Sequence, residues 1–500
     1  MLKTIRITLA AVMFIGITLL LLDFTGTLHH WLGWMAKVQF LPALMALNAV
    51  VVAGLILLTL LFGRIYCSVI CPLGIMQDLF GWLGKRAKKN RYTYSAEKRW
   101  LRYGMLAVFI AAAVAGVSVV FRLLAPYSAY GRIVSSLLQP VYLWGNNLLA
   151  SLAEHYDSYA FYQADVWLKS LSVLVIAAVT LVVLAVLAWR NGRTYCNTIC
   201  PVGTILSFFA RFSLVKIRFD ADKCRNCSLC TKNCKGACID YKNHRVDYSR
   251  CIVCGDCLQS CHFGALRYGA PSKPPRGEAF SNSASPSREA GSVTSRRSFL
   301  LSTALLTTAA LAQEAKKVDG GLAEIADKAI PKRQTPLTPP GSLSAQNMAH
   351  HCTGCQLCIA ACPNGVLRPS SDLMSLMQPV MSYERGYCRP ECNRCSEVCP
   401  AGAIRPIERE TKASTQIGHA VWVKKNCIPL VDGVSCGNCA RHCPTEAIEM
   451  VPSDPNDDES VKIPVVNEAR CIGCGSCEHL CPARPFTAIY VEGHEVHKEI

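Results

Sequence analysis

The chain has 500 residues, which is too long for a single domain, and 51% of them are hydrophobic, with the apolar residues crowded into the first 190 positions. Its 29 cysteines fall in short-spaced runs, which excludes the disulfide framework of a small secreted protein. The net charge of +17 could indicate nucleic-acid binding, but the basic residues concentrate beside apolar segments, as between Lys85 and Arg102. Membrane topology explains that cluster, so we expect no nucleic-acid partner.

Four stretches are apolar and long enough to cross the hydrocarbon of a bilayer as helices: residues 4–22, 38–62, 104–124 and 167–189. Nine Lys and Arg lie in the loop 63–103, whereas Arg132 is the only one in the loop 125–167. The positive-inside rule therefore places the N-terminus, the basic loop and the chain after the fourth stretch in the cytoplasm. We predict an α-helical membrane domain at residues 1–215, with four spans in two parallel halves.

Each half ends in the motif C-x3-C-P, once within Gly63–Gly74 and again within Gly192–Gly203. The proline suits the first turn of a helix, and the helix dipole favours the thiolate of a cysteine just before it. The four thiolates could jointly hold a further metal centre, or each pair could be a dithiol that transfers electrons by exchange. A packing role is the third alternative, since free cysteine is a common buried residue. The candidates are Cys67, Cys71, Cys196 and Cys200.

Residues 216–269 carry two cysteine runs with the C-x2-C-x2-C-x3-C spacing of bacterial ferredoxins. Zinc sites usually use C-x2-C pairs separated by longer stretches, so the spacing favours iron–sulfur clusters. The runs are Cys224, Cys227, Cys230 and Cys234, then Cys251, Cys254, Cys257 and Cys261. Lys235 and His262 replace the usual proline after each run, and Cys238 is an additional cysteine.

This unit resembles a two-cluster ferredoxin of the α+β class. The resemblance implies that the last cysteine of each run binds the cluster of the other run. One cluster would take Cys224, Cys227, Cys230 and Cys261, and the other Cys251, Cys254, Cys257 and Cys234.

A Pro- and Ser-rich linker at residues 270–293 leads to a twin-arginine segment at 294–312, in which Arg296 and Arg297 precede a mildly apolar stretch. Such a segment is an export signal for proteins that cross the membrane already folded. It predicts that the clusters before and after it work on opposite faces of one membrane. Cleavage after Ala312 would give two pieces, whereas an uncleaved segment would be a fifth span. A second linker covers residues 313–344.

The last domain, residues 345–500, holds four more cysteine runs, each followed by proline. They are Cys352, Cys355, Cys358 and Cys362; Cys388, Cys392, Cys395 and Cys399; Cys427, Cys436, Cys439 and Cys443; and Cys471, Cys474, Cys477 and Cys481. We therefore predict an α+β ferredoxin-like domain with four [4Fe–4S] clusters outside the cytoplasm. With the two cytoplasmic clusters the chain would carry six.

Residues 1–268 resemble the NapH family of membrane quinol-dehydrogenase components, on the basis of the four spans, the twin C-x3-C-P motifs and the two-cluster unit. Residues 294–500 resemble the NapG (MauM) family, on the basis of the twin-arginine leader, the four runs and the irregular third run. The resemblance implies a fused protein of the bacterial inner membrane. It would oxidise menaquinol or ubiquinol and pass the electrons to a periplasmic reductase or small electron carrier. Resemblance to four-cluster electron-transfer subunits further implies that the first C-terminal run pairs with the fourth and the second with the third, although the sequence leaves sequential pairing open.

A second function remains open on the sequence: a maturation factor that reduces metal ions or thiols during respiratory enzyme assembly. A redox sensor or scaffold would need fewer clusters than six, so the predicted cluster count argues against it. The quinol site has no strong candidate. Five titratable residues in predicted outward loops are better explained as solvated interfacial groups; they are Asp23, His29, His30, Glu154 and His155.

Overall fold

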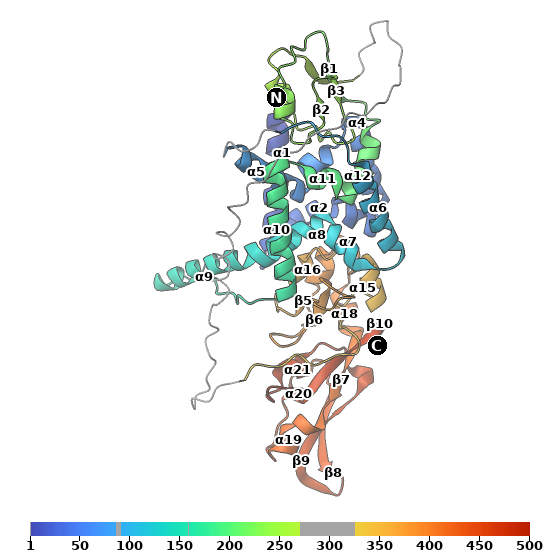
Figure 1. Ribbon diagram of the computed structural model, residues 1–500. Coiled ribbons are helices and arrows are strands. Elements are labelled where there is room, and N and C mark those ends of the chain that lie inside the picture. The colour runs from blue at the N-terminus through green and yellow to red at the C-terminus, as the bar shows by residue number, and fades with distance from the viewer. Residues whose placement is uncertain (1, 87–91, 159, 271–325) are drawn as a thin grey trace, which may run out of the picture. The chain divides into compact units, whose positions relative to one another are not determined.

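The computed structural model describes residues 2–86, 92–158, 160–270 and 326–500 (Figure 1). Residues 1–271 and 329–500 belong to one unit of the structure, which is divided from residues 272–328. The predicted twin-arginine segment 294–312, with Arg296, Arg297 and the cleavage position Ala312, lies outside the described residues.

The first part of the chain is built from helices, because apolar residues with few glycines or prolines fill long stretches of it. These are α1 (Leu2–Leu22), α2 (Thr27–Lys37), α3 (Phe40–Met45), α4 (Ala49–Phe62), η1 (Tyr66–Ile70), α5 (Pro72–Arg86), α6 (Arg99–Val114), α7 (Ser118–Leu124), α8 (Pro126–Ile133), η2 (Val134–Leu138), α9 (Gln139–His155), α10 (Leu171–Asn191), α11 (Thr194–Thr198) and α12 (Pro201–Ala210).

Within the described residues, only two helices are long and apolar enough to cross a membrane, at Lys3–Leu22 and Leu171–Asn191. The prediction of four spans is therefore not supported. The stretch 38–62 is divided between α3 and α4, because the backbone turns left-handed at Leu47 (φ 53°) and Asn48 caps a new helix. The stretch 104–124 is divided between α6 and α7 at Gly116, whose φ of 74° suits glycine.

The two long helices have a buried and an exposed apolar face. In α1, Ile17 and Leu20 are fully buried, whereas Val12 and Ile15 are more than half exposed. In α10, Ala177 is fully buried and Val179 is 57% exposed. Apolar side chains therefore cover both the packed and the outward face of these helices.

A small α+β unit follows the helices, and it holds β1 (Lys216–Phe219), α13 (Leu229–Lys232), β2 (Ile239–Asp240), β3 (Arg245–Val246), α14 (Asp256–Ser260) and β4 (Leu266–Gly269). Strands β1 and β4 pair antiparallel, with Ile217 opposite Tyr268, and β2 pairs with β3. Ile217, Ile239 and Leu266 form its core together with five of its cysteines and Val253. The core is small, so cysteines supply much of its buried surface.

The C-terminal part is also α+β, and it holds α15 (Ala345–His351), α16 (Leu357–Ala361), β5 (Leu367–Pro369), β6 (Pro379–Met381), α17 (Arg394–Val398), α18 (Arg409–Ser414), β7 (Thr415–Trp422), η3 (Lys424–Asn426), α19 (Ile428–Val431), α20 (Asn438–Arg441), β8 (Ile448–Asp454), β9 (Asp457–Val466), η4 (Glu468–Arg470), α21 (Ser476–Leu480) and β10 (Ile489–Glu499). Three antiparallel pairs form, β5 with β6, β7 with β10 and β8 with β9.

Buried arginines tie the helices to the cysteine-bearing parts. Arg122 of α7 is fully buried and donates from Nη1 to the carbonyl of Leu376 at 2.8 Å and from Nε to that of Cys352 at 3.4 Å. Arg132 of α8 donates in turn to the carbonyl of Arg122 at 2.7 Å. Arg193 directly follows α10, and its backbone amide donates to the carbonyl of Lys235 at 2.9 Å. Lys235 belongs to the small α+β unit with the first two cysteine runs, called the two-run unit below.

Candidate iron–sulfur sites

The two-run unit brings its cysteines together across the runs. Cys224, Cys227, Cys230 and Cys261 line one cavity. The other four also meet, since Cys257 interacts electrostatically with Cys254, Cys251 and Cys234. Helices α13 and α14 pack against each other, so the cysteine after each helix lies beside the opposite run. This is the crossed arrangement that the ferredoxin resemblance implies.

Local backbone geometry helps to aim these thiols. The residue before α13 is Ser228 and the one before α14 is Gly255, and both have left-handed backbones, with φ of 58° and 78°. Gln356 before α16 and Gly475 before α21 repeat this geometry, with φ of 67° and 78°. The turn reverses the chain between the second and third cysteine of a run, so that both thiols face the same space.

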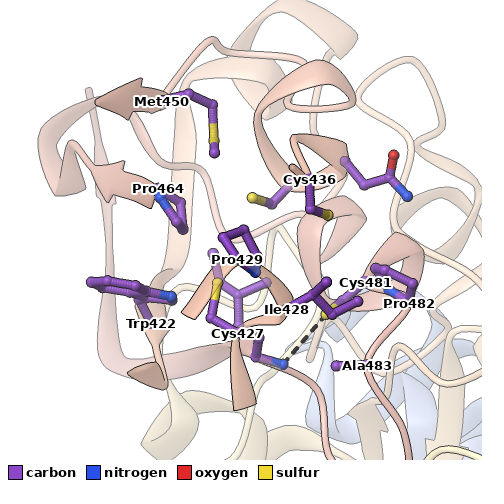
Figure 2. A pocket seen from close by; sticks show the side chains of 14 residues that line it. Trp422, Cys427, Ile428, Pro429, Cys436, Met450, Pro464, Cys481, Pro482 and Ala483 are labelled. Atoms are coloured by element: carbon purple, nitrogen blue, oxygen red, sulfur yellow. Dashed lines mark hydrogen bonds between the residues drawn. The ribbon is translucent and has the colours of Figure 1, made fainter. Parts of the chain in front are cut away.

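The four C-terminal runs also cross, but they do so between neighbours in the sequence. Cys352, Cys355, Cys358 and Cys399 line one cavity, and Cys427, Cys436, Cys439 and Cys481 line another. Figure 2 shows the second of these, with Cys427, Cys436 and Cys481 around the cavity and Trp422, Met450 and Pro464 also lining it. The remaining two groups join Cys362 to Cys388, Cys392 and Cys395, and Cys443 to Cys471 and Cys474, beside which Cys477 also lies.

The predicted pairing of the first run with the fourth and of the second with the third is therefore wrong. Helix α16 of the first run packs on α17 of the second, and α20 of the third packs on α21 of the fourth. The short connections between neighbouring runs make this packing local, and each helix delivers its last cysteine to the partner run.

The buried thiols suit a cationic inorganic core. Burial raises the pKa of Cys355 and Cys474 to about 12, and that of Cys439 to about 11. Thiols of this kind stay protonated at neutral pH unless a metal replaces the proton. Among the described residues, no three or more Cys, His, Asp or Glu have the geometry to hold a single ion. In a [4Fe–4S] cluster each cysteine binds a different iron, so its ligands are spread more widely.

The two C-x3-C-P motifs meet in the helical part. The sulfurs of Cys67, Cys71, Cys196 and Cys200 lie close enough together that all six pairs would repel if the thiols were charged, and each of the four residues is 4% exposed. Cys71 and Cys200 both have extended backbones just before α5 and α12, and Pro72 and Pro201 begin those helices. The motif thus starts a helix in each copy, and the two helix starts converge on one buried place.

The candidate quinol residues have mostly local roles. Asp23 accepts hydrogen bonds from the amides of Gly26 and Leu28 and lies 3.1 Å from Nδ1 of His29. Burial alone would raise the pKa of Asp23, but the His29 contact and the other hydrogen bonds hold it well below its usual value. Asp23 therefore shapes the turn after α1. His155 is at the exposed end of α9 beside Tyr156.

A cavity of about 420 Å³ lies close to Cys362 of the first C-terminal run, and residues of the segment before α10 line part of its wall. This cavity was not predicted from the sequence. Trp167 contributes to its wall and stacks with the guanidinium groups of Arg368 and Arg385, 4.6 and 5.0 Å from its ring centre. Lys169 donates to Oε1 of Gln139 at 2.9 Å. A lysine at the start of an apolar stretch was the available signal, although such a residue usually anchors a helix at the membrane surface.

Comparison with known proteins supports the assignment of the cysteine runs to 4Fe-4S binding. Two family models described as 4Fe-4S dicluster domains match residues 434–484 and 247–366, and a 4Fe-4S binding domain matches residues 44–91 and 171–220, which contain the C-x3-C-P motifs. No solved structure matches. The resemblance of the first half to the NapH family stays a prediction.

Among curated relatives, the methylamine utilization ferredoxin-type protein MauM of Paracoccus denitrificans is 35% identical over 167 residues, which is 32% of this chain and 73% of that relative. MauM of Methylobacillus flagellatus is 33% identical over 153 residues, 29% of this chain and 64% of the relative. The ferredoxin-type protein NapG of Escherichia coli K12 is 32% identical over 153 residues, 29% of this chain and 65% of the relative. The chain thus spans just under two thirds of two of these relatives and almost three quarters of the third. With its 4Fe-4S domains and its crossed cysteine runs, the chain belongs to the MauM family of ferredoxin-type proteins.

Proposed function

We propose that this protein is anchored in the bacterial inner membrane and passes electrons from menaquinol or ubiquinol through [4Fe–4S] clusters to a periplasmic reductase or small electron carrier. The observation that best supports this proposal is that groups of cysteines lie at opposite ends of α10. Arg193 contacts the two-run unit just after this helix, and Trp167 contacts the C-terminal part just before it. A helix of 21 residues is about 30 Å long, which is the thickness of a bilayer core.

The described contacts support a relay through the C-terminal groups. The group of Cys352 contacts the helices, since Arg122 donates to its backbone. Cys358 interacts with Cys395 of the next group, and the amide of Cys388 donates to the carbonyl of Cys474 at 2.9 Å. Cys477 interacts in turn with Cys439 of the last group. Four clusters at these positions would form one line leading away from the helices, and the two-run unit would bring the total to six.

The cavity beside Cys362 is our candidate for the quinol head group. It has the size of a small-molecule site, and it combines aromatic walls with a few polar groups. Oxidation of one quinol releases two electrons and two protons. The electrons would pass singly into the adjacent clusters, and the protons to Asp165 or His479 at the cavity wall and then to water.

One experiment on the full-length protein separates this function from the maturation factor. Purified protein with oxidised clusters is mixed anaerobically with a water-soluble quinol, and the loss of cluster absorbance is followed. We expect rapid reduction, slowed several-fold by Trp167→Ala at low quinol concentration and unchanged by the matched control Trp31→Ala, because Trp31 is 74% exposed and does not line the cavity. Reduction only by thiols, or electron delivery only to copper ions, would instead favour the maturation factor.

A further inference from the structure

The two copies of the C-x3-C-P motif build one site rather than two. Their four sulfurs come from η1, α11 and the starts of α5 and α12, and they lie together in the buried core. A pair of independent dithiols would need the two cysteines of one copy to face each other, with no special relation to the other copy. Here Cys196 lies close to Cys67 of the other copy, and Cys200 lies close to both Cys67 and Cys71 of that copy.

Each of the four sulfurs has a hydrogen-bond donor. Gln77 donates from Nε2 to Cys196 at 3.2 Å, and the amide of Gly203 donates to Cys200 at 3.4 Å. The amide of Gly74 serves Cys71 in the same way, and Nη2 of Arg64 lies 3.7 Å from the sulfur of Cys67. Donors directed at every sulfur stabilise negative charge on sulfur, as they do around protein-bound iron–sulfur clusters.

The charged side chains around the four sulfurs would be stabilised by an anion bound between those sulfurs. The side chain of Arg64 is fully buried, and its partners within the described residues are neutral apart from the sulfur: the carbonyls of Cys196 and Ser249 and the amide oxygen of Asn197. A buried guanidinium without an anionic partner is costly. Arg193 does bind Asp78, but that carboxylate also pairs with Arg6 and Lys235.

Both motifs lie within the segments that match a 4Fe-4S binding domain. We propose that Cys67, Cys71, Cys196 and Cys200 bind one [4Fe–4S] cluster shared between the two copies, in addition to the ferredoxin-type clusters proposed above. Loading it releases the four thiol protons, and the ligated cluster carries a net negative charge that Arg64 and Arg193 offset. In its redox step one ferric iron is reduced to ferrous when a reduced ferredoxin-type cluster on one side gives up an electron, and that iron is oxidised again when the electron passes to an oxidised cluster on the other side.

The location gives such a cluster a role as a bridge between the two ferredoxin-type parts. On one side Arg64 joins the carbonyl of Cys196 to that of Ser249, two residues before Cys251. On the other side the hydroxyl of Tyr195 donates to the carbonyl of Leu124 at 3.4 Å, next to the chain segment that Arg132 binds. Arg132 in turn donates to the backbone of Arg122, which donates to the backbone of Cys352. The inference does not depend on quinol as the electron donor.

The test is iron and sulfide analysis of full-length protein, purified without oxygen, for four single variants: Cys67→Ser, Cys71→Ser, Cys196→Ser and Cys200→Ser. We expect each to lose the same cluster, about four irons per chain, together with the same component of the reduced EPR spectrum. The double variant Cys67→Ser/Cys196→Ser should lose no more than either single one. The matched control Ser68→Ala, in the same turn and also buried, should keep the full iron content. Unchanged iron in the four cysteine variants would overturn the proposal and favour paired dithiols.

A second measurement tests the proposal even if the four cysteine variants do not accumulate as folded protein. Arg64→Gln leaves all four sulfurs in place and removes one positive charge beside them. We expect the potential of one EPR component to become more negative, because the reduced cluster carries more negative charge than the oxidised one. Arg64 also contacts the backbone of Ser249 in the two-run unit, so a second variant is needed to assign the shift to the shared site. We expect Arg193→Gln to shift the potential of the same EPR component. Failure of both variants to shift a shared component would also overturn the proposal, whatever the quinol assay shows.

Discussion

Arg64 and Arg193 occupy equivalent positions in the two C-x3-C-P copies, and each binds the backbone of the other copy. Nη2 of Arg64 donates to the carbonyl of Cys196 at 3.2 Å, and Nη1 of Arg193 donates to the carbonyl of Cys67 at 2.5 Å. The two motif copies are therefore joined by a reciprocal exchange of arginine contacts. These contacts also account for the burial of both arginines, in segments that the positive-inside rule placed in the cytoplasm.

The exchange leaves no room for a side chain at Gly203. A Cβ added there would lie 2.2 Å from the carbonyl oxygen of Cys196 and 2.9 Å from Nη2 of Arg64. We expect Gly203→Ala to destabilise the protein by about 1–3 kcal/mol, measured as a lower thermal midpoint in detergent. Gly145→Ala is the control, because a Cβ at this exposed position in α9 meets no atom within 4 Å. It should stabilise by up to about 1 kcal/mol, and equal effects of both substitutions would contradict the close approach.

The neighbour pairing of the C-terminal runs can be tested by double variants. Cys399 shares a cavity with Cys352, and Cys481 shares one with Cys427. The double variant Cys352→Ala/Cys399→Ala should lose the iron of one cluster, whereas Cys352→Ala/Cys481→Ala should lose that of two. Iron analysis together with EPR of the reduced protein measures this. The opposite order of losses would restore the pairing of the first run with the fourth.

Cys238 is the additional cysteine of the two-run unit, and the structure gives it a contact. Its sulfur lies 3.4 Å from that of Cys234, and it also interacts with Cys251. Cys234 and Cys251 belong to the same cysteine group, so the thiol of Cys238 is placed to donate a hydrogen bond to a sulfur of that cluster. Cys238→Ala should make the potential of that cluster more negative without loss of iron, because hydrogen bonds to the sulfurs help to set the potential. Cys238→Ser keeps a donor and should shift the potential less; a loss of about four irons would show instead that Cys238 is a ligand.

His497 in β10 predicts a pH-dependent stability of the C-terminal part. Burial lowers the pKa of His497 to about 4, with nearby His494 acting in the same direction, and its Nε2 lies 3.0 Å from the hydroxyl of Thr338. The unfolded chain, with a pKa of about 6.5, binds more protons between these values, so stability is complete above pH 6.5 and falls as the pH drops towards 4. By pH 5 the loss should be on the order of 1–2 kcal/mol.

Thermal unfolding at pH 7 and pH 5 measures this loss. His497→Gln keeps a polar side chain but does not titrate, so its midpoint should fall less than that of the unaltered protein over the same interval. Identical pH dependence in both proteins would show that other groups control acid stability.

Much of the ferredoxin chemistry could be predicted from the sequence, because a C-x2-C-x2-C run binds its cluster over a few neighbouring residues. The spans were harder, since single backbone positions such as Leu47 and Gly116 interrupt stretches whose composition is continuous. Composition measures how apolar a stretch is and not whether one helix runs through it.

The amino-acid sequence alone therefore determined which three cysteines of each run act together and that the cofactor class is iron–sulfur, because spacing along a short segment limits where its thiols can point. Only the tertiary structure decided which run supplies the fourth cysteine, because helix packing controls that choice. It also decided that two motifs join in one site, through contacts such as that of Arg64 with Cys196, 132 residues away in the chain. Such contacts depend on how whole helices pack, and no local pattern specifies them.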